Sequence, residues 1–594
     1  MRVADYIIER LIEVGLTHAY SVTGRGALFL TDAVAKNKEL KNISMHHEQA
    51  AGYAAVAHSQ YTNQISLCLV STGCASTNAI TPVLSAWQDG IPTFFLSGQN
   101  TLSETTRFTG IPIRTFGQQE ADIISLVESI SKYSVMLEDP ELIGLEMDKL
   151  IASATSGRKG PVWLDVPLDL QSMQIDPETL KRLPTSQDQM VPKIGSDIEK
   201  VVSWLIESKS PLLLLGHGTR SADAIPELKA LIKQTDIPLI FTASAVDIIG
   251  SGNQGSIGSI GMMGCSRSAA HALQEADLLI ILGSRMNSMI TGPNFDDFAR
   301  KSKVVLVDID GVEHSKPGRK YDLHLKVDIK NFLRALSSKI EFKTSLAWKN
   351  HCERLRLQNS KLENFMSGGD GVDLYQMANI LSRELPDEGV LVTDSGFIEL
   401  ILPTNINFKN GQRSLHPISQ GAMGYALPAA IGAHYASGRE VFSVIGDGSI
   451  MMNIQEFQTI SHNQIPIVVI VVNNNAYAII RKRQVELFRE RTIGTDDSNG
   501  LSCPNFEEVA KCFNIQYLKA STAEEFESTF DQAKKLHGPV LIEVQGVSNQ
   551  EYIQMARGKN SEGKLVQMPI ENQFPFVLNE ASTDGFISTN VKTK

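Results

Sequence analysis

Short apolar runs alternate with amphipathic, helix-like stretches along most of the chain. The first segment carries such runs at residues 65–70, 93–96 and 161–166. Strands that alternate with helices imply a parallel sheet covered by helices on both faces. The pattern restarts twice, at residues 211–216, 278–283 and 304–308, and then at 390–394, 441–445, 465–472 and 539–544. We therefore predict an α/β protein built from three doubly wound parallel-sheet domains.

Polar stretches interrupt this pattern and predict the domain boundaries. The chain has 594 residues, several times the ~150 residues of a typical domain. Residues beyond about 558 are polar and have little periodicity, so we expect an extended arm there. The predicted organisation is a first domain at 1–175, a linker at 176–193, a central domain at 194–340, a linker at 341–370, a third domain at 371–560 and a tail at 561–594.

Composition narrows the functional classes. The chain is 42% hydrophobic and 20% charged, and it contains no apolar run of the ~18 residues that a membrane span needs. It starts with an amphipathic helix and lacks the zones of a signal peptide, so we expect a cytoplasmic protein. The net charge is −11, and no long basic cluster suggests a nucleic-acid surface. The six cysteines are scattered without a C-x-x-C pair, which disfavours a zinc site. Small-molecule chemistry is the favoured class.

A βαβ unit in the third domain carries hard-metal chemistry. A strand at 441–445 leads into the turn Gly-Asp-Gly-Ser at 446–449, then a helix at 453–462, a strand at 465–472 and three asparagines at 473–475. The carboxyl ends of parallel strands lie at one sheet edge, so Asp447 and the asparagines should meet there. Their carboxylate and amide oxygens suit Mg²⁺, and the glycines let backbone N–H groups approach a phosphate. Taken alone, Gly-Asp-Gly is a common surface turn.

An acid stands at the head of a helix in the first domain. The sequence His-His-Glu-Gln-Ala-Ala-Gly-Tyr-Ala-Ala at 46–55 puts Glu48 before a run of small residues. Such an acid interacts favourably with the helix dipole, which is sufficient reason for its presence. It can also serve as a hydrogen-bond donor to a cofactor ring.

These motifs together resemble the acetolactate synthase group of thiamine diphosphate enzymes, from residue 1 to about 560. Asn473 stands 24 positions after Ser449, as in the thiamine diphosphate motif, and residues 421–428 (GAMGYALP) match GAMGFGLP of the family. The resemblance implies that Mg²⁺ is held by Asp447, the Asn474 side chain and the Ala476 carbonyl. It implies that Glu48 activates the aminopyrimidine ring and that Met423 supports the bent cofactor. The remaining cofactor contacts fall to Gly24, Asn78, Gly396, Gly446, Gly448 and Ser449.

Two glutamines are candidates on the substrate side. Gln99 and Gln119 lie in segments similar to family elements whose glutamines face the reacting centre. They would orient a 2-oxo acid, although ordinary loop-end glutamines are an open alternative. In the loop at 71–78, Cys74 and Ser76 depart from the family pattern TSGPGATN. In the family, the cofactor lies between two chains, so a homodimer or homotetramer is implied.

Arg483 departs from the acetolactate synthase pattern, because it stands where those enzymes carry a tryptophan. A guanidinium favours a phosphate, carboxylate or hydroxyl-rich acceptor over a small apolar one. Residues 477–484 are more similar to a branch that occurs with surface-polysaccharide biosynthesis. A solvated basic helix face is the other interpretation.

The central domain carries partial matches to the flavin site of the family. These are Gly264 in GMMG, Arg285 in GSR, Asp308 in DID and Asp328. Glycine turns after strands bind dinucleotides, but they also simply end strands, so FAD binding stays open.

The leading hypothesis is a decarboxylating carboligase that moves a C2 acyl unit from pyruvate to a carbonyl acceptor. Acyl transfer to a keto sugar, simple 2-oxo acid decarboxylation and a non-catalytic family member are the alternatives. The last is disfavoured because Glu48, Asp447 and Asn474 are all present.

Overall fold

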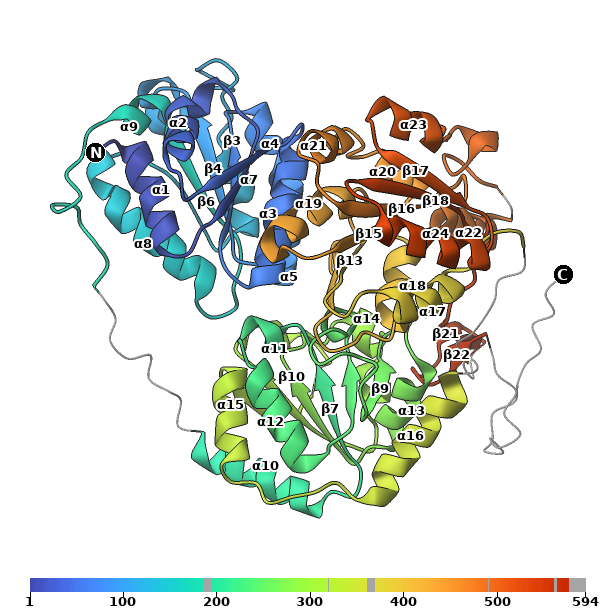
Figure 1. Ribbon diagram of the computed structural model, residues 1–594. Coiled ribbons are helices and arrows are strands. Elements are labelled where there is room, and N and C mark those ends of the chain that lie inside the picture. Colours follow the sequence, from blue (N-terminus) through green and yellow to red (C-terminus); the bar gives the residue numbers. More distant parts are fainter. Residues whose placement is uncertain (185–193, 319, 361–368, 490, 560–562, 576–594) are drawn as a thin grey trace.

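Three six-stranded parallel sheets, each flanked by helices, make up the protein (Figure 1). The computed structural model describes residues 1–184, 194–318, 320–360, 369–489, 491–559 and 563–575. The first domain, in blue, lies beside the third, in orange and red, and the middle domain, in green, lies below both. The predicted fold class, three doubly wound α/β domains, is confirmed.

The first sheet has the strand order β2-β1-β3-β4-β6-β5. Its central strands are buried over their full length, because helices cover both faces of a parallel sheet. The strands are β1 (His18–Ser21), β2 (Lys41–Ser44), β3 (Ser66–Val70), β4 (Thr93–Gln99), β5 (Tyr133–Met136) and β6 (Val162–Pro167). The helices are α1 (Val3–Glu13), α2 (Leu28–Lys36), α3 (Glu48–Thr62), α4 (Cys74–Asn78), α5 (Ile80–Asp89), α6 (Thr106–Thr109), α7 (Ile123–Val127), α8 (Ile143–Thr155) and α9 (Leu168–Ser172).

The third sheet repeats this topology, with the order β14-β13-β15-β16-β18-β17. Its strands are β13 (Val390–Thr393), β14 (Arg413–Leu415), β15 (Val441–Gly446), β16 (Ile467–Asn473), β17 (Gln516–Ala520) and β18 (Val540–Gln545). Its helices are α17 (Leu374–Glu384), α18 (Phe397–Asn405), α19 (Ala426–Ser437), α20 (Asp447–Ile450), α21 (Glu456–His462), α22 (Ala478–Phe488), α23 (Phe506–Cys512) and α24 (Ala523–Lys535). Equivalent strands in the two domains therefore end at equivalent edges.

The middle sheet has a different order, β12-β11-β10-β7-β8-β9. This is the order of dinucleotide-binding sheets, in which the strand order reverses between the first and fourth strands, here β7 and β10. The strands are β7 (Pro211–Leu215), β8 (Leu239–Phe241), β9 (Ser256–Ser259), β10 (Leu278–Leu282), β11 (Lys303–Asp308) and β12 (Leu323–Lys326). The helices are α10 (Gly195–Glu207), α11 (Gly218–Ser221), α12 (Ile225–Thr235), α13 (Arg267–Glu275), α14 (Ser288–Thr291), α15 (Ile329–Ser337) and α16 (Leu346–Ser360).

Parts of the predicted second linker and of the predicted tail pack against the middle domain. Within 341–370, α16 lies on the middle domain, where Trp348 is buried and its indole N–H donates to the Pro211 carbonyl at 2.9 Å. In the tail, β21 (Leu565–Gln567) pairs with β20 (Arg557–Lys559), and β22 (Gln573–Phe574) pairs with β19 (Gln554–Met555). The side chain of Ile570 is buried in the same core as Trp348. The rest of the predicted tail, and residues 185–193 of the first linker, lie outside the described residues.

Helices α3 and α19 join the first and third domains, and they lie side by side in Figure 1. A Cβ on Gly432 of α19 would stand 2.0 Å from the Ala54 carbonyl oxygen of α3, so only glycine allows this approach. Tyr425 donates to the Gln60 side chain at 2.8 Å across the same joint. The first and third domains of one chain are therefore firmly packed together.

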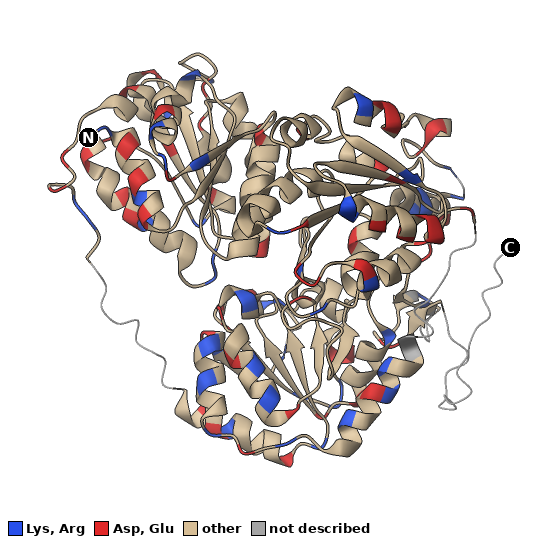
Figure 2. Ribbon diagram, viewed as in Figure 1, with Lys and Arg blue, Asp and Glu red and all other residues tan. Residues whose placement is uncertain are grey.

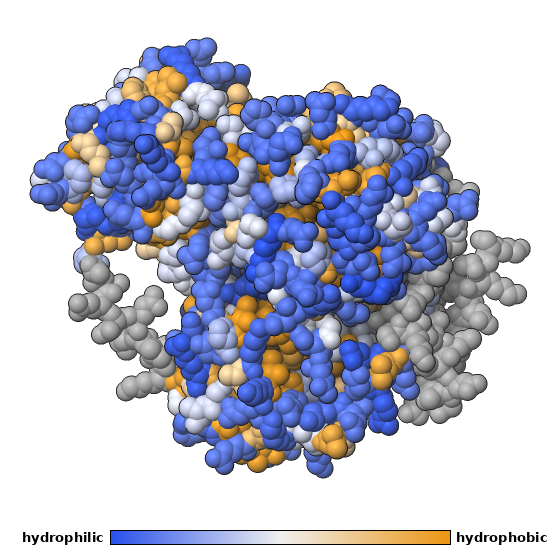
Figure 3. Space-filling model, in the orientation of Figure 1, coloured by the Kyte–Doolittle hydropathy of each residue, from blue (hydrophilic) through white to orange (hydrophobic). Residues whose placement is uncertain are grey.

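Surface properties agree with a compact multidomain protein. Figure 2 shows Lys and Arg interspersed with Asp and Glu on helices such as α10, α12 and α16. In the face shown in Figure 3, apolar surface gathers where the middle domain meets the other two. Among the described residues, no helix combines the length and apolarity needed to cross a bilayer.

Candidate active site

The carboxyl ends of β1, β2, β3 and β4 bring one group of predicted residues to the same edge of the first sheet. Glu48 is the first residue of α3, directly after β2, and it is half-buried. Asn78, at the end of α4 after β3, donates its amide N–H to Glu48 Oε2 at 2.9 Å. Gly24 follows β1 and packs against Ser71, because a Cβ there would lie 2.5 Å from Ser71 Cβ. This edge thus presents a carboxyl group held by an amide.

The two predicted substrate glutamines have different settings. Gln119 is exposed, and its carbonyl oxygen packs against Gly73, beside α4. Gln99 is only 2% exposed, and its amide donates to the Ala121 carbonyl and to Asp165 while its oxygen accepts from the Asn100 backbone N–H. Gln99 therefore does not face the edge in this chain, because all its hydrogen-bonding atoms are engaged inside the fold.

The third sheet presents the metal-ligand group at its equivalent edge. Asp447 is buried, and its carboxylate accepts from the backbone N–H of Gly448 at 2.7 Å and of Asn474 at 3.0 Å. The Asn474 side-chain oxygen accepts from the Ala476 N–H at 3.2 Å. Burial raises the pKa of Asp447, and these backbone hydrogen bonds oppose that rise. Residues 447–450, predicted as a turn, form the single helical turn α20.

A cavity of about 120 Å³ adjoins these oxygens. The residues that line it include Gly396, Met423, Gly446, Asp447, Gly448, Ser449, Asn474 and Ala476. A Cβ on Gly448 would stand 1.9 Å from Tyr477 Cε1, so this glycine has no room for a side chain. No described group of three or more His, Cys, Asp or Glu could hold a metal ion, so a metal here would depend on one carboxylate with amide and carbonyl oxygens.

Asp394 was missed by the sequence reasoning although it belongs to this site. It is buried directly after β13, and its carboxylate accepts from Ser449 Oγ at 2.5 Å and from the Ala426 N–H at 2.8 Å. It therefore joins the cavity-lining Ser449 to the start of α19. Burial raises the pKa of its carboxyl group. Its position at the end of the apolar run 390–394 was the available signal.

Arg483 lies outside the cavity lining, on α22. Its guanidinium donates to the Tyr552 hydroxyl at 2.5 Å and to the Gln554 side chain at 3.3 Å, and it pairs with Glu486 at 2.9 Å. The neighbouring Lys482 pairs with Glu551 at 2.5 Å. These contacts fasten α22 to residues 551–554, so Arg483 is neither inside the cavity nor freely solvated.

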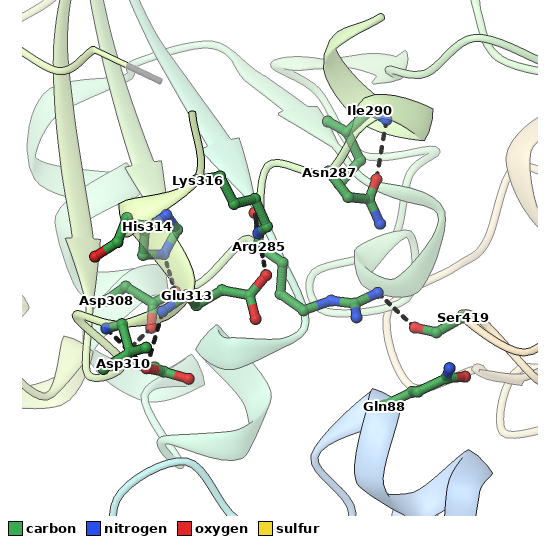
Figure 4. Close-up of polar contacts among 12 residues, drawn as sticks. Gln88, Arg285, Asn287, Ile290, Asp308, Asp310, Glu313, His314, Lys316 and Ser419 are labelled. Carbon is green, nitrogen blue, oxygen red and sulfur yellow. Dashed lines mark hydrogen bonds and ion pairs between the residues drawn. The ribbon is translucent and has the colours of Figure 1, made fainter. Parts of the chain in front are cut away.

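A second cavity, of about 550 Å³, lies where the three domains meet. Arg285, Asp308 and Asp328 line it, and Figure 4 shows Arg285 reaching Ser419 of the third domain, a hydrogen bond of 2.5 Å. Asp308 accepts from the Asp310 N–H at 2.9 Å, and Asp328 accepts from the Lys330 N–H at the start of α15. The wall of the cavity therefore contains both carboxylate side chains and backbone turns.

Glycines at the switch between β7 and β10 shape this cavity. Gly216 and Gly283 follow these strands, and a Cβ on Gly216 would stand 2.2 Å from the Gly283 carbonyl oxygen. The Gly-His-Gly sequence at 216–218, after a buried strand, was the signal that the sequence reasoning passed over. Gly264 is not among the lining residues; its φ is +72°, and a Cβ would lie 1.7 Å from the Leu400 carbonyl oxygen. It serves close packing of the middle domain on α18.

Comparison with known proteins gives matches to all three domains. Models of the thiamine pyrophosphate enzyme family match residues 1–126 as the N-terminal TPP binding domain, 198–336 as the central domain and 394–544 as the C-terminal TPP binding domain. The acetolactate synthase large subunit of Porphyra purpurea is 30% identical over 579 residues, covering 93% of this chain and 94% of that protein. The acetolactate synthase isozyme 2 large subunit of Escherichia coli (strain K12) is 28% identical over 545 residues, covering 92% and 95%.

Proposed function

The chain belongs to the acetolactate synthase-like thiamine pyrophosphate enzymes, and from this membership we propose that it is a decarboxylating carboligase. It would transfer a C2 acyl unit from pyruvate to a second carbonyl compound. One observation carries the proposal: Glu48 and Asp447 occupy equivalent carboxyl edges of two sheets with identical topology. These are the edges where α/β sheets bind ligands.

The residues present fit thiamine diphosphate with Mg²⁺. Asp447, the Asn474 side chain and the Ala476 carbonyl offer only hard oxygen ligands, which Mg²⁺ prefers. Gly448 and Ser449 would hold the diphosphate, since both line the cavity beside Asp447. When bound, the cofactor supplies an electron sink for cleavage of the C1–C2 bond of a 2-oxo acid.

Chain residues supply the proton and the orientation. The Glu48 carboxyl would exchange a proton with the aminopyrimidine ring, and Asn78 fixes its direction through the 2.9 Å hydrogen bond. Gln119, exposed on the same edge, would orient the 2-oxo acid. Met423 lines the cavity and would support the cofactor through its flexible thioether side chain.

We propose a cytoplasmic homodimer or homotetramer in which each site joins two chains. The described residues that line the diphosphate cavity all fall between 372 and 550, so the first domain of the same chain contributes none of them. In this proposal, Glu48 reaches a cofactor that another copy holds. Exposed apolar side chains near this edge, including Ile113 and Phe116, are suited to burial against that copy.

FAD is our proposal for the cavity between the domains. The cavity suits an adenine dinucleotide in three respects. These are the strand order of the middle sheet, the close approach of Gly216 to Gly283, and a volume of about 550 Å³. Asp308, Asp328 and Arg285 line this cavity and would hold the dinucleotide. Purified protein with a flavin absorption spectrum would support this proposal. Protein that stays colourless and shows no flavin quenching on titration with FAD would contradict it.

The acceptor is tested by product analysis. Protein supplied with thiamine diphosphate, Mg²⁺ and pyruvate should release CO₂, and the product with each acceptor distinguishes acetolactate, a branched-chain sugar and acetaldehyde. Acetolactate from pyruvate alone would support the family activity. No turnover with any 2-oxo acid and acceptor would instead favour the non-catalytic alternative.

A further inference from the structure

A buried carboxyl group lies beneath the substrate side of the first domain. Asp165 on β6 is 1% exposed and stands opposite Ser97 in the register of β4 and β6. Ser97 Oγ donates to Asp165 Oδ1 at 2.6 Å, and the Gln99 amide donates to Oδ2 at 3.0 Å. Trp163 donates its indole N–H to Ser97 at 2.8 Å, which leaves the Ser97 hydrogen for Asp165. Both partners of this carboxyl group are neutral donors.

Gln99 and Asn100 connect Asp165 to the loop at 117–121. The Gln99 amide also donates to the Ala121 carbonyl at 3.0 Å, while the Asn100 side chain donates to the Gln118 carbonyl at 3.0 Å. The Gln99 oxygen accepts from the Asn100 backbone N–H at 3.0 Å. The two carbonyls that flank Gln119 are thus held by adjacent residues at the end of β4.

Gln119 needs such support, because its backbone has a φ of 61°. A residue other than glycine pays a steric cost in this region and adopts it where its surroundings impose it. The loop is tightly placed on both sides. A Cβ on Gly117 would lie 2.6 Å from Asn100 Cγ, and one on Gly73 would lie 1.6 Å from the Gln119 carbonyl oxygen. A small shift of Gln99 or Asn100 would therefore move Gln119.

We propose that Asp165 is a positioning residue whose carboxylate locks Gln99 and, through Gln99 and Asn100, holds the 117–121 loop so that Gln119 can orient the 2-oxo acid. This inference rests on the proposed function for the identity of the ligand. Asp165 does not itself touch substrate. The Gln99 amide has one satisfactory orientation, since its oxygen must accept from Asn100 and its N–H groups must donate to Ala121 and Asp165.

Protonation of Asp165 would disturb this arrangement. A carboxyl proton on Oδ2 would confront the Gln99 N–H, and a proton on Oδ1 would be accepted by Ser97 only if the Ser97 hydroxyl turned its own hydrogen away, so the donors around the ionised carboxylate would have to rearrange. Burial raises the pKa of Asp165 to about 7, against the effect of its two hydrogen bonds. The charged groups that face it are Asp122, the N-cap of α7, which adds to the rise, and Arg107 on α6, which opposes it. These two residues pair with each other at 3.1 Å. The ionised, loop-holding form would predominate above about pH 7.

The loop can be followed without catalysis. Hydrogen exchange of the 115–121 amides, corrected for intrinsic rates, should show severalfold weaker protection at pH 6 than at pH 8 in the wild-type full-length protein. Asp165→Asn should give equal protection at both pH values, because an amide oxygen can still accept from Gln99 and no longer titrates. Ser97→Ala removes a hydrogen bond that lowers the pKa of Asp165, so the transition should move to higher pH while the contacts of Gln99 remain. Protection that depends on pH equally in wild type and Asp165→Asn would overturn the proposal.

Activity gives the second readout. The wild-type kcat/KM for pyruvate should fall as the pH drops through about 7, and this limb should be absent in Asp165→Asn. Gln99→Met keeps the volume but releases the loop, so its KM should rise on the order of tenfold to hundredfold at all pH values. An acid limb unchanged in both Asp165→Asn and Ser97→Ala would contradict the assignment. If no 2-oxo acid is turned over while the exchange pattern follows the expectation, the proposed function fails and the loop-holding role stands.

Discussion

Two inactive variants of this chain should form an active hetero-oligomer if the site joins two chains. Glu48→Gln removes the proton donor of the first domain, and Asp447→Asn removes the carboxylate of the third. In a twofold dimer, one site pairs the two altered edges and the other pairs the two intact ones. Co-expression with two different tags isolates dimers that carry one chain of each kind. These dimers should have about half the wild-type turnover per dimer, because one site in two is complete.

The matched control places both substitutions on one chain and pairs it with wild type. Each site of that dimer then has one altered edge, so turnover should be nearly absent. A site formed within one chain predicts the reverse, with no activity in the first dimer and about half in the control. CO₂ release from pyruvate measures both dimers. Half activity in the control dimer would refute the reasoning from the cavity lining.

Three further substitutions test other parts of the structure. In Gly448→Ala, the new Cβ would lie 1.9 Å from Tyr477, so thiamine diphosphate should bind roughly tenfold to hundredfold more weakly in isothermal titration. Adding Tyr477→Ala should recover part of the lost affinity. Unchanged affinity in Gly448→Ala would contradict the close packing of Gly448 against Tyr477. Burial lowers the pKa of His58 to about 3, whereas an unfolded histidine titrates near ~6.5. The thermal midpoint should therefore fall as the pH drops from ~6.5 to ~4, and it should fall less steeply in His58→Gln. Parallel curves for the two proteins would rule out His58 as a source of the pH dependence. Arg483→Trp should shift the acceptor preference if Arg483 selects the acceptor. An unaltered product spectrum together with faster proteolysis of residues 551–554 would show that Arg483 serves only to attach α22 to these residues.

The fold was largely predictable because burial leaves a simple record in the sequence. Parallel strands covered on both faces read as continuous apolar runs, as in Leu278–Leu282, and each predicted run corresponds to a strand. For residues 341–370, however, the sequence pattern did not predict packing against a domain. Helix α16 is polar over most of its surface, and the contacts of Trp348 that seat it on the middle domain are with residues far away in sequence.

Site residues that directly follow a strand could be predicted from the sequence. Residues whose side-chain orientation depends on tertiary contacts were harder to predict. Asp447 and Asn474 lie together because parallel strands bring their ends to one edge, and Met423 lines the same cavity from the loop between β14 and α19. Gln99 also stands at a strand end, but the side chain turns inward because Asp165, 66 positions away, accepts its amide N–H. No local pattern in the sequence reports such a pairing.

The repeated topology adds an argument for the two-chain site. Helix α3 follows β2 in the first domain, α19 follows β14 in the third, and these equivalent helices pack against each other. The two domains of one chain thus meet through equivalent helices, and none of the described residues that line the diphosphate cavity comes from the first domain. A second copy placed by a true twofold axis could offer each edge its counterpart. The close approach at Gly432 packs the two domains of one chain tightly together, and the association of two chains is the step that we propose to complete the site.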